Sequence, residues 1–350
     1  MPIATNKPVV VTGITGFVAA HCALTLLEKG YTVRGTVRSQ SKADQFSQLP
    51  HFKKYVQKKK LEFSIVEDVA SSDFTEAMSD GVEVVLHLAS PFHMGKGEPE
   101  STFLIPAKKG TENALKTAHK VGTVKNFVLT SSFAAVLSMD DPGLPLSGKV
   151  YTEDDWNRAT YEQAKETDNP GFAYCASKKV AEKAAYDYQK ENGLESKMTI
   201  SSICGPMIMG PLVHSLDKLD NLNESLSQVW EIVSGKCGKE LPATGFPAFA
   251  DVRDIANAHI TAFEKNVQGR FLIYSGPYDS QRIVDLAVEK FPNEYKGVKG
   301  SPGETIDKNP KVFKLDTTKA EKELDFKPKS FETTFGDMIG QMFELQKQGK

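Results

Sequence analysis

Five Tyr-x-x-x-Lys pairs in this sequence could supply a proton donor for carbonyl chemistry. On a helix, this spacing places the phenol and the ammonium on one face, about 5–6 Å apart at Cβ. The positive charge favours the phenolate and lowers the phenol pKa from its reference of about 10. The tyrosine can then protonate a carbonyl oxygen near neutral pH. The pairs are Tyr55/Lys59, Tyr161/Lys165, Tyr174/Lys178, Tyr186/Lys190 and Tyr295/Lys299.

Position along the chain favours Tyr174 and Lys178 among these pairs. Tyr174 opens the strongest predicted helix, 173–191, directly after a break at Asn169-Pro170-Gly171. Small apolar residues follow in this helix, so it can pack on a sheet. The alternative is an ordinary pair on a helix surface.

Two hydroxyl side chains, Ser131 and Ser132, end an apolar strand predicted at 126–130. In a parallel sheet, the carboxyl ends of the strands form the edge at which ligands bind. We therefore expect these serines and the tyrosine to share one reactive edge.

A glycine turn follows the first predicted strand, in the segment TGITGFVA at 12–19. Gly13 and Gly16 allow the backbone to turn tightly and to approach a pyrophosphate. The helix N-terminus beyond them offers free N–H groups and a positive dipole. The spacing is G-x-x-G-x-x-A, and it predicts nucleotide binding, although glycine turns after strands are common.

The end of the second strand favours NADP over NAD. NAD-binding proteins usually carry an acidic residue there for the ribose 2′-hydroxyl. This chain has Arg38 and Lys42 and no carboxylate before Asp44. A guanidinium matches the geometry of a 2′-phosphate. The alternative is solvated surface charge, and Arg34 is ambiguous between the same two roles.

Later strand ends supply further candidate contacts. Asp68 follows the third strand and could accept a hydrogen bond from the adenine amino group, or it could simply cap a turn. Ala89 and Ser90 follow the fourth strand, where small residues let a dinucleotide cross the sheet. His87 is expected to be a core histidine. No clustered metal-ligand spacing occurs, so no metal is expected.

The elements that must position these residues alternate between strand and helix, which predicts a doubly wound parallel α/β sheet of Rossmann type, with about seven strands. From about Pro206 the pattern loosens and prolines become frequent. We therefore expect a nucleotide-binding domain over 1–205, joined by segments returning at about 246–276. A smaller substrate lobe would comprise 206–245 and 277–350. The predicted strands are 9–12, 31–37, 61–66, 82–88, 126–130, 197–203 and 270–274; the predicted helices include 17–29, 103–121, 224–235, 252–264, 283–290 and 331–346.

Composition limits the partners. The 43 basic and 45 acidic residues give a net charge of -2, which offers no long-range attraction to nucleic acid or anionic lipid. No apolar run approaches the ~20 residues that span a bilayer. The four cysteines form no disulfide framework. We expect a cytoplasmic protein whose partner is a small molecule, with neither nucleic acid nor membrane.

Taken together, these motifs resemble the extended short-chain dehydrogenase/reductase family, in its dihydroflavonol-reductase-like branch. The likeness is carried by VTGITGFVAAH, VRGTVRSQSKA, VLHLASPF, LTSSFAAV, AYCASKKVAEKAA and DVRDIANAHI, which lie between residues 11 and 260. The resemblance implies NADPH-dependent reduction of aldehydes and ketones by a Ser132-Tyr174-Lys178 triad. Relatives often pair through helices after the fourth and fifth strands, so a homodimer is one arrangement that it implies.

The resemblance also implies the residues around the two ligands. Lys178 would hold the nicotinamide ribose, Arg38 the 2′-phosphate, and Ser131 would be an accessory hydroxyl. The expected cofactor contacts are Thr12, Gly13, Thr15, Gly16, Phe17, Val18, Arg38, Lys42, Asp68, Val69, Ala89, Ser90, Ser131, Tyr174, Lys178 and Pro206. The expected substrate contacts are Phe92, Phe133, Met207 and Met209, with Phe246 as a further wall.

Two departures from the family pattern stand out. The Asn-Pro that often follows the sixth strand is replaced by Gly205-Pro206, and the asparagine that relatives use in proton relay is replaced near Ala107. Two other functions remain open. One is a nucleotide-sugar epimerase or dehydratase with bound NAD, and the other is a non-enzymatic NADP sensor.

Overall fold

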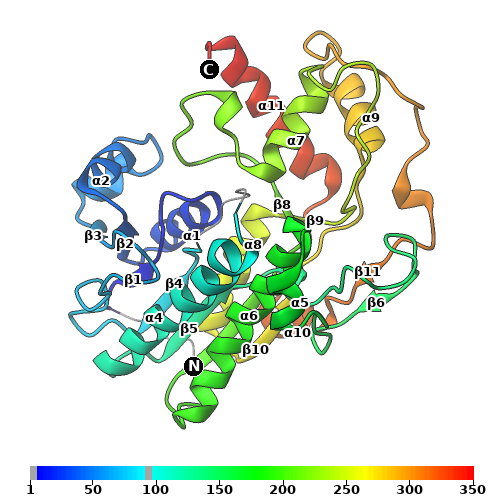
Figure 1. Cartoon of the computed structure of the whole chain (residues 1–350). Coiled ribbons are helices and arrows are strands. Elements are labelled where there is room, and N and C mark those ends of the chain that lie inside the picture. Colours follow the sequence, from blue (N-terminus) through cyan, green and yellow to red (C-terminus); the bar gives the residue numbers. More distant parts are fainter. Residues whose placement is uncertain (1–5, 91–96) are drawn as a thin grey trace.

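A seven-stranded parallel sheet forms the centre of the computed structural model, which describes residues 6–90 and 97–350 (Figure 1). Its spatial order is β10-β7-β5-β4-β1-β2-β3. From β1 the chain builds outward through β2 and β3 and then crosses back to β4, so the order reverses between β1 and β4. Ligands bind at such a switch point, outside the carboxyl ends of the strands. The strands are β1 (Val9–Val11), β2 (Val33–Val37), β3 (Leu61–Ile65), β4 (Val84–His87), β5 (Asn126–Thr130), β7 (Thr199–Cys204) and β10 (Gly269–Leu272).

Helices cover both faces of this sheet, which explains why its strands are apolar on both sides. Val9 and Val11 belong to the core under α1 (Phe17–Glu28) and α8 (Val252–Glu264). Val10, between them, belongs to the opposite core, under α4 (Ile105–Val121) and α6 (Pro170–Glu191). The predicted doubly wound architecture is therefore confirmed.

The helix that carries the candidate acid begins earlier than the sequence predicts. The Asn169 side chain caps α6 by accepting from the backbone N–H groups of Gly171, at 2.9 Å, and Phe172, at 3.2 Å. Pro170 takes the first helical position, where its missing N–H costs nothing. The turn signal Asn-Pro-Gly is thus the start of the helix, and Tyr174 lies in its second turn.

A smaller lobe is built from α7 (Glu224–Val233), α9 (Ser280–Lys290) and α11 (Phe331–Lys347), which lie together at the top of Figure 1. A short parallel pair, β8 (Met207–Met209) and β9 (Phe249–Asp251), leads into it from the sheet. Phe17, the first residue of α1, belongs to the apolar core of this lobe, so the two domains share packing.

One segment assigned to the smaller lobe belongs to the larger domain. Helix α10 (Thr318–Leu324) contacts α8 and β10, and its Ala320 and Leu324 join the core under α1. The sequence prediction placed all of 277–350 in the lobe, whereas apolar side chains of α10 complete the outer layer of the sheet. The remaining short elements are α2 (Gln40–Ser47), α3 (Lys53–Gln57), α5 (Tyr161–Glu166), β6 (Val150–Tyr151) and β11 (Lys314–Leu315).

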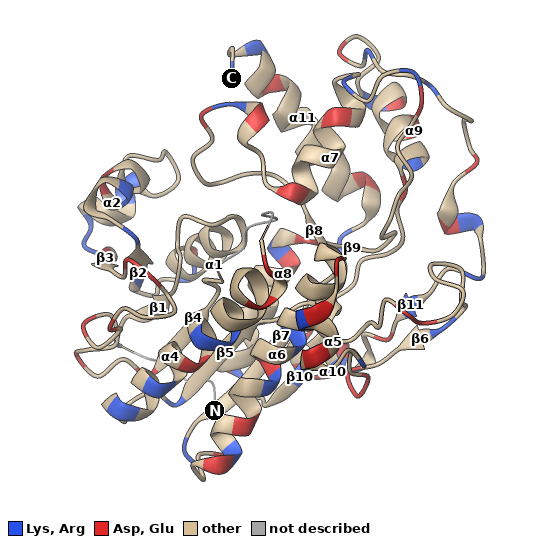
Figure 2. Ribbon diagram, viewed as in Figure 1, with Lys and Arg blue, Asp and Glu red and all other residues tan. Residues whose placement is uncertain are grey.

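Charged side chains of both signs are spread over both domains (Figure 2). Within residues 6–90 and 97–350, no helix is both long enough and apolar enough to cross a bilayer. The same part of the chain contains no cluster of three or more His, Cys, Asp or Glu side chains able to hold a metal ion.

Candidate active site

Ser132, Tyr174 and Lys178 meet at the carboxyl edge of the sheet. The Ser132 hydroxyl lies near the Tyr174 phenol and acts to lower the pKa of that phenol. Ser132 follows β5 directly, and its Oγ also accepts from the Ala134 backbone N–H at 3.1 Å. One helical turn below Tyr174, the Lys178 Nζ lies 5.3 Å from the centroid of the tyrosine ring. It also donates to the Ser90 Oγ at 3.4 Å, so the ammonium turns toward the site.

Burial dominates the electrostatics of this cluster. Desolvation, with a smaller contribution from Cys175, raises the pKa of Tyr174 above its usual range, while the hydrogen bond from Ser132 acts in the opposite direction. Desolvation lowers the pKa of Lys178 to about 8. The expectation that the ammonium depresses the phenol pKa is not met, because desolvation is the largest effect on Tyr174 and raises that pKa. Tyr174 is held as a neutral proton donor.

The other tyrosine–lysine pairs have different environments. Tyr161 donates to Glu100 at 3.0 Å, and Lys165 pairs with the same carboxylate. Tyr186 donates to the Ser202 hydroxyl, farther down α6. Tyr295 donates to a backbone carbonyl in the smaller lobe. Compared with these three pairs, Tyr174 and Lys178 are the pair that lies beside Ser132, and Tyr174 is also the tyrosine that its position along the chain favoured.

The glycine turn after β1 approaches the end of β4 closely. Gly13 has a φ of +64°, and a Cβ there would lie 3.1 Å from the Ala89 Cβ. The Gly13 N–H donates to Thr36 Oγ1 at 2.9 Å. No side chain caps the N-terminus of α1 at Gly16, and its first turn holds no acidic residue. These N–H groups and the helix dipole form a cradle suited to an anionic group.

Thr12, in the same turn, already has hydrogen-bond partners within the protein. The Thr12 Oγ1 is fully buried, where it accepts from the N–H groups of Leu88 and Ala89, both at 2.9 Å, and contacts His87 Nδ1 at 3.1 Å. His87 is buried, as expected for a core histidine. Thr12 thus fixes the ends of β1 and β4 together. Thr15, Phe17 and Val18 bring their backbone to the N-terminus of α1, while the Phe17 ring packs into the smaller lobe.

The basic residues after β2 separate into two groups. Arg38 and Lys42 are exposed at the start of α2. No hydrogen bond or ion pair joins Arg38 to another residue in 6–90 or 97–350. Arg34, which the sequence left ambiguous, is buried on β2 and pairs with Glu62 at 2.7 Å and Asp80 at 2.8 Å. Arg34 is a structural residue, and Arg38 is the free guanidinium.

Asp68 and Ser131 use their side chains inside the protein. The Asp68 carboxylate accepts from the Ala70 N–H at 2.9 Å and the Ser71 hydroxyl at 2.6 Å, and these bonds lower its pKa. Asp68 therefore caps a turn, which is the second of the two roles that the sequence left open for it. Val69, beside it, is half-buried. The Ser131 hydroxyl donates to Glu182 at 2.7 Å, so it has a structural partner away from Ser132.

The expected substrate residues fall into three situations. Phe133 is fully buried among the rings of Tyr151, Phe246 and Phe313, and Met209 is fully buried in the core of the smaller lobe. Both side chains are therefore part of the protein core, with no surface exposed to a substrate. Met207 and Pro206 are half-buried at the exit of β7. Phe92 lies outside the described residues.

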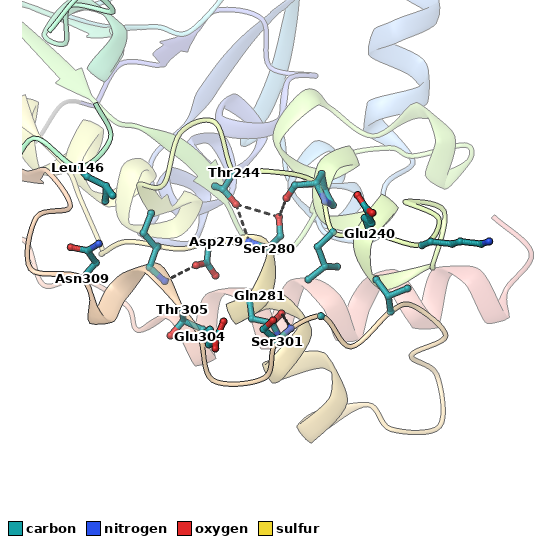
Figure 3. A pocket seen from close by; sticks show the side chains of 16 residues that line it. Leu146, Glu240, Thr244, Asp279, Ser280, Gln281, Ser301, Glu304, Thr305 and Asn309 are labelled. Carbon is teal, nitrogen blue, oxygen red and sulfur yellow. Dashed lines mark hydrogen bonds between the residues drawn. The ribbon is translucent and has the colours of Figure 1, made fainter. Parts of the chain in front are cut away.

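A hollow of about 700 Å³ lies in the smaller lobe, between the start of α9 and the segment 298–309 (Figure 3). None of the three clustered residues lines it. Two of its polar side chains bond to the protein: Asp279 accepts from the Ile306 N–H, and Gln281 accepts from the Ser301 N–H at 2.7 Å. It is separate from the cluster at the sheet edge.

Sequence reasoning missed one group near the site, the buried pair of Glu182 and Arg270. Glu182 is fully buried, and the Arg270 Nε donates to it at 2.8 Å. Glu182 follows Lys178 by four residues and therefore continues the Tyr174/Lys178 spacing. The sequence signal that could have indicated Glu182 is an acidic residue on a helix face otherwise made of small side chains.

A parallel sheet with a glycine turn and an uncapped helix N-terminus at its switch point defines a Rossmann-type dinucleotide-binding protein. Within that class the chain belongs to the NAD dependent epimerase/dehydratase family, whose model matches residues 9–274.

Individual relatives extend over nearly the whole chain. An uncharacterized oxidoreductase of Schizosaccharomyces pombe is 41% identical over 99% of both chains. The NADPH-dependent methylglyoxal reductase GRE2 of Saccharomyces cerevisiae is 31% identical over 97% of this chain and 98% of the relative. The crystal structure of yeast methylglyoxal/isovaleraldehyde reductase Gre2 with NADPH has a TM-score of 0.85 at 29% identity, and the match covers 98% of this chain and all of that one.

Proposed function

We propose that this protein is an NADPH-dependent reductase that converts aldehydes and ketones to alcohols. The observation that carries the proposal is the approach of the Ser132 hydroxyl to the Tyr174 phenol, with Lys178 beside the phenol ring. The relatives whose names give a reaction include methylglyoxal reductases that use NADPH. Small carbonyl compounds such as methylglyoxal or aryl ketones are therefore the proposed substrates.

The residues at the switch point fit such a cofactor. The cradle formed by Gly13, Gly16 and the N-terminus of α1 suits a pyrophosphate, and a Cβ at residue 13 would crowd the Ala89 Cβ at 3.1 Å. Arg38 is exposed beside it without a protein partner among the described residues, which suits a 2′-phosphate. Ala89 and Ser90 border the path between these groups and Lys178.

The side chains at the sheet edge divide the chemistry among them. NADPH, when bound, supplies the hydride that reaches the carbonyl carbon. Tyr174 donates its proton to the carbonyl oxygen. Ser132 donates a hydrogen bond to the same oxygen as negative charge develops, a contribution of about 3 kcal/mol. Lys178 orients the site and keeps a positive charge near the phenol as it loses its proton.

Replacing Tyr174 by Phe tests the proposal. The ring and its packing remain, whereas the proton donor is lost, so NADPH oxidation with methylglyoxal or phenylglyoxal should fall by about 10²–10⁴-fold. NADPH binding, followed by fluorescence titration, should stay within twofold. Near wild-type turnover in Y174F would refute the assigned acid.

The same assay separates the alternatives. A nucleotide-sugar epimerase would retain tightly bound NAD and would not consume added NADPH. An NADP sensor would bind NADPH without turnover in either the wild type or Y174F. A cytoplasmic location, a homodimer and the absence of nucleic-acid and membrane partners remain predictions, to be checked by localisation and light scattering.

A further inference from the structure

We propose that the buried pair of Glu182 and Arg270 positions Ser132 against Tyr174 and thereby sets the rate of carbonyl reduction. The inference rests on the proposed function and adds residues to it that do not touch the substrate. The pair makes contacts with residues on both sides of Ser132.

Glu182 connects the helix of the acid to the strand of the serine. It lies two turns after Tyr174 in α6, about 12 Å along the helix axis. Its fully buried Oε2 accepts from the Ser131 hydroxyl at 2.7 Å, and Ser131 is the residue directly before Ser132. One carboxylate thus joins the rigid helix that carries Tyr174 to the backbone that carries Ser132.

Arg270 fixes the other flank of Ser132. From β10 it donates to both Glu182 oxygens, Nε at 2.8 Å and Nη2 at 3.2 Å. The same Nη2 donates to the Ala135 carbonyl at 3.5 Å, three residues after Ser132. Its Nη1 donates to the carbonyls of Glu153 and Asp155, and the guanidinium stacks 3.6 Å from the Trp156 ring. Arg270 therefore links the turn at 133–135 to the segment that contains Glu153 and Asp155.

A buried ion pair gives no clear stability advantage over apolar residues of similar volume. The structure nonetheless places this pair so that one of its hydrogen bonds reaches Ser131, before Ser132, and another reaches the Ala135 carbonyl, after it. Catalytic groups need their geometry held within about 0.5 Å. A pair that fixes the separation of the Ser132 and Tyr174 hydroxyls would supply this precision.

Ser131→Ala tests the positioning role with the least disturbance. It removes the link between Glu182 and β5 but leaves the carboxylate paired with Arg270, so no buried charge is stranded. We expect kcat to fall about tenfold, with the NADPH dissociation constant within twofold of wild type. Ser202→Ala is the matched control, because it removes a buried serine hydrogen bond to Tyr186 on the same helix, at 3.0 Å, away from Ser132. Its kcat should stay within twofold.

The outcomes separate this inference from the proposed function. A kcat within twofold of wild type in S131A, or an equal loss in S202A, overturns the positioning role while Y174F still tests the acid. A raised NADPH dissociation constant with unchanged kcat would assign Ser131 to the cofactor and also overturn it. Crystal structures give a readout independent of turnover. The distance between the Ser132 and Tyr174 hydroxyls should lengthen in S131A and stay unchanged in S202A, and an unchanged distance in S131A contradicts the inference even if the protein reduces no carbonyl.

Discussion

At the scale of single residues, desolvation acts in opposite directions on the two titrating groups of the site. It raises the pKa of Tyr174 and lowers the pKa of Lys178, so both neutral forms are favoured. A neutral phenol is the form that donates a proton. The amine, by contrast, changes charge within the range in which enzymes are assayed.

The pH dependence of turnover should follow from this amine. Desolvation lowers the pKa of Lys178 to about 8, so its positive charge is present below that pH and is lost above it. We expect kcat/KM for NADPH, which reports groups of the free enzyme, to fall as pH rises through about 8. In Lys178→Arg, whose guanidinium stays charged, the plateau should extend upward even if its level is lower. A wild-type profile that is flat to pH 10 would contradict this.

Arg38 should determine the choice between the two nicotinamide cofactors. Arg38→Ala removes a charge-assisted contact of about 1.5–3 kcal/mol, so KM for NADPH should rise roughly 10- to 150-fold. KM for NADH, which has no 2′-phosphate, should not rise. Lys53→Ala, an exposed charge on α3, is the control in steady-state kinetics with both cofactors. Equal effects of the two substitutions would indicate only a general electrostatic influence.

Residue types were easier to interpret from the sequence than the directions of their side chains. Arg34 lies near the start of β2 and Arg38 follows its last residue, yet one is buried in two ion pairs and the other is exposed. Phe133 follows Ser132 directly, and its ring nevertheless packs into an aromatic core. These outcomes depend on partners such as Asp80 and Phe313, far away in sequence.

At the scale of elements, the turn between β1 and α1 has two separable requirements. Gly13 needs a positive φ, and it also needs empty space beside Ala89. Gly122, which ends α4, has a similar φ of +71°, but nothing lies within 4 Å of a Cβ built there. The two glycines therefore separate backbone strain from steric blockage.

Gly13→Ala and Gly122→Ala should each lower the free energy of unfolding by about 1–2 kcal/mol, because an L-residue is strained at these φ values. Only Gly13→Ala should weaken NADPH binding, tenfold or more, since its methyl group pushes β4 away from the cradle. Denaturant unfolding and fluorescence titration measure the two effects. Comparable losses of affinity in both variants would show that strain alone is responsible.

Elements with a strong local signal were predicted well. The strand at 126–130 and the helix at 252–264 have the predicted bounds. The pair β8 and β9 was missed, because three-residue strands are stabilised by a partner some forty residues away and not by their own composition. Of the candidate site, the Tyr174/Lys178 pair and the glycine turn were accessible from spacing and position, and the family resemblance implied Ser132. Glu182 and Arg270 required the tertiary structure.

At the scale of the whole molecule, a buried carboxylate joins the two domains. Asp251, at the end of β9, is fully buried and accepts from the Arg253 Nε at 2.9 Å and Nη2 at 2.7 Å. It also accepts from the Thr334 hydroxyl of α11 at 2.8 Å. Arg253 reaches Asp337 on the same helix at 2.7 Å. This network attaches the smaller lobe to the start of α8.

Removing the buried partner should cost far more than removing the exposed one. Asp251→Ala leaves Thr334 without its acceptor and leaves Arg253 with only the half-exposed Asp337, and we expect a loss of about 2–4 kcal/mol in the free energy of unfolding. Asp337→Ala removes a half-exposed contact, so about 0–1 kcal/mol is expected. Thermal unfolding of both variants measures the difference. Similar melting temperatures would mean that this network does not hold the domains together.

The return of α10 to the sheet has a consequence for how the protein is made. Its apolar residues close the layer over β10 and α8, yet they leave the ribosome only after more than 300 residues have been synthesised. Until then, part of that layer is uncovered in the nascent chain. Completion of the larger domain is therefore a late event, and a chain released before residue 318 would expose an apolar face to the cell's chaperones.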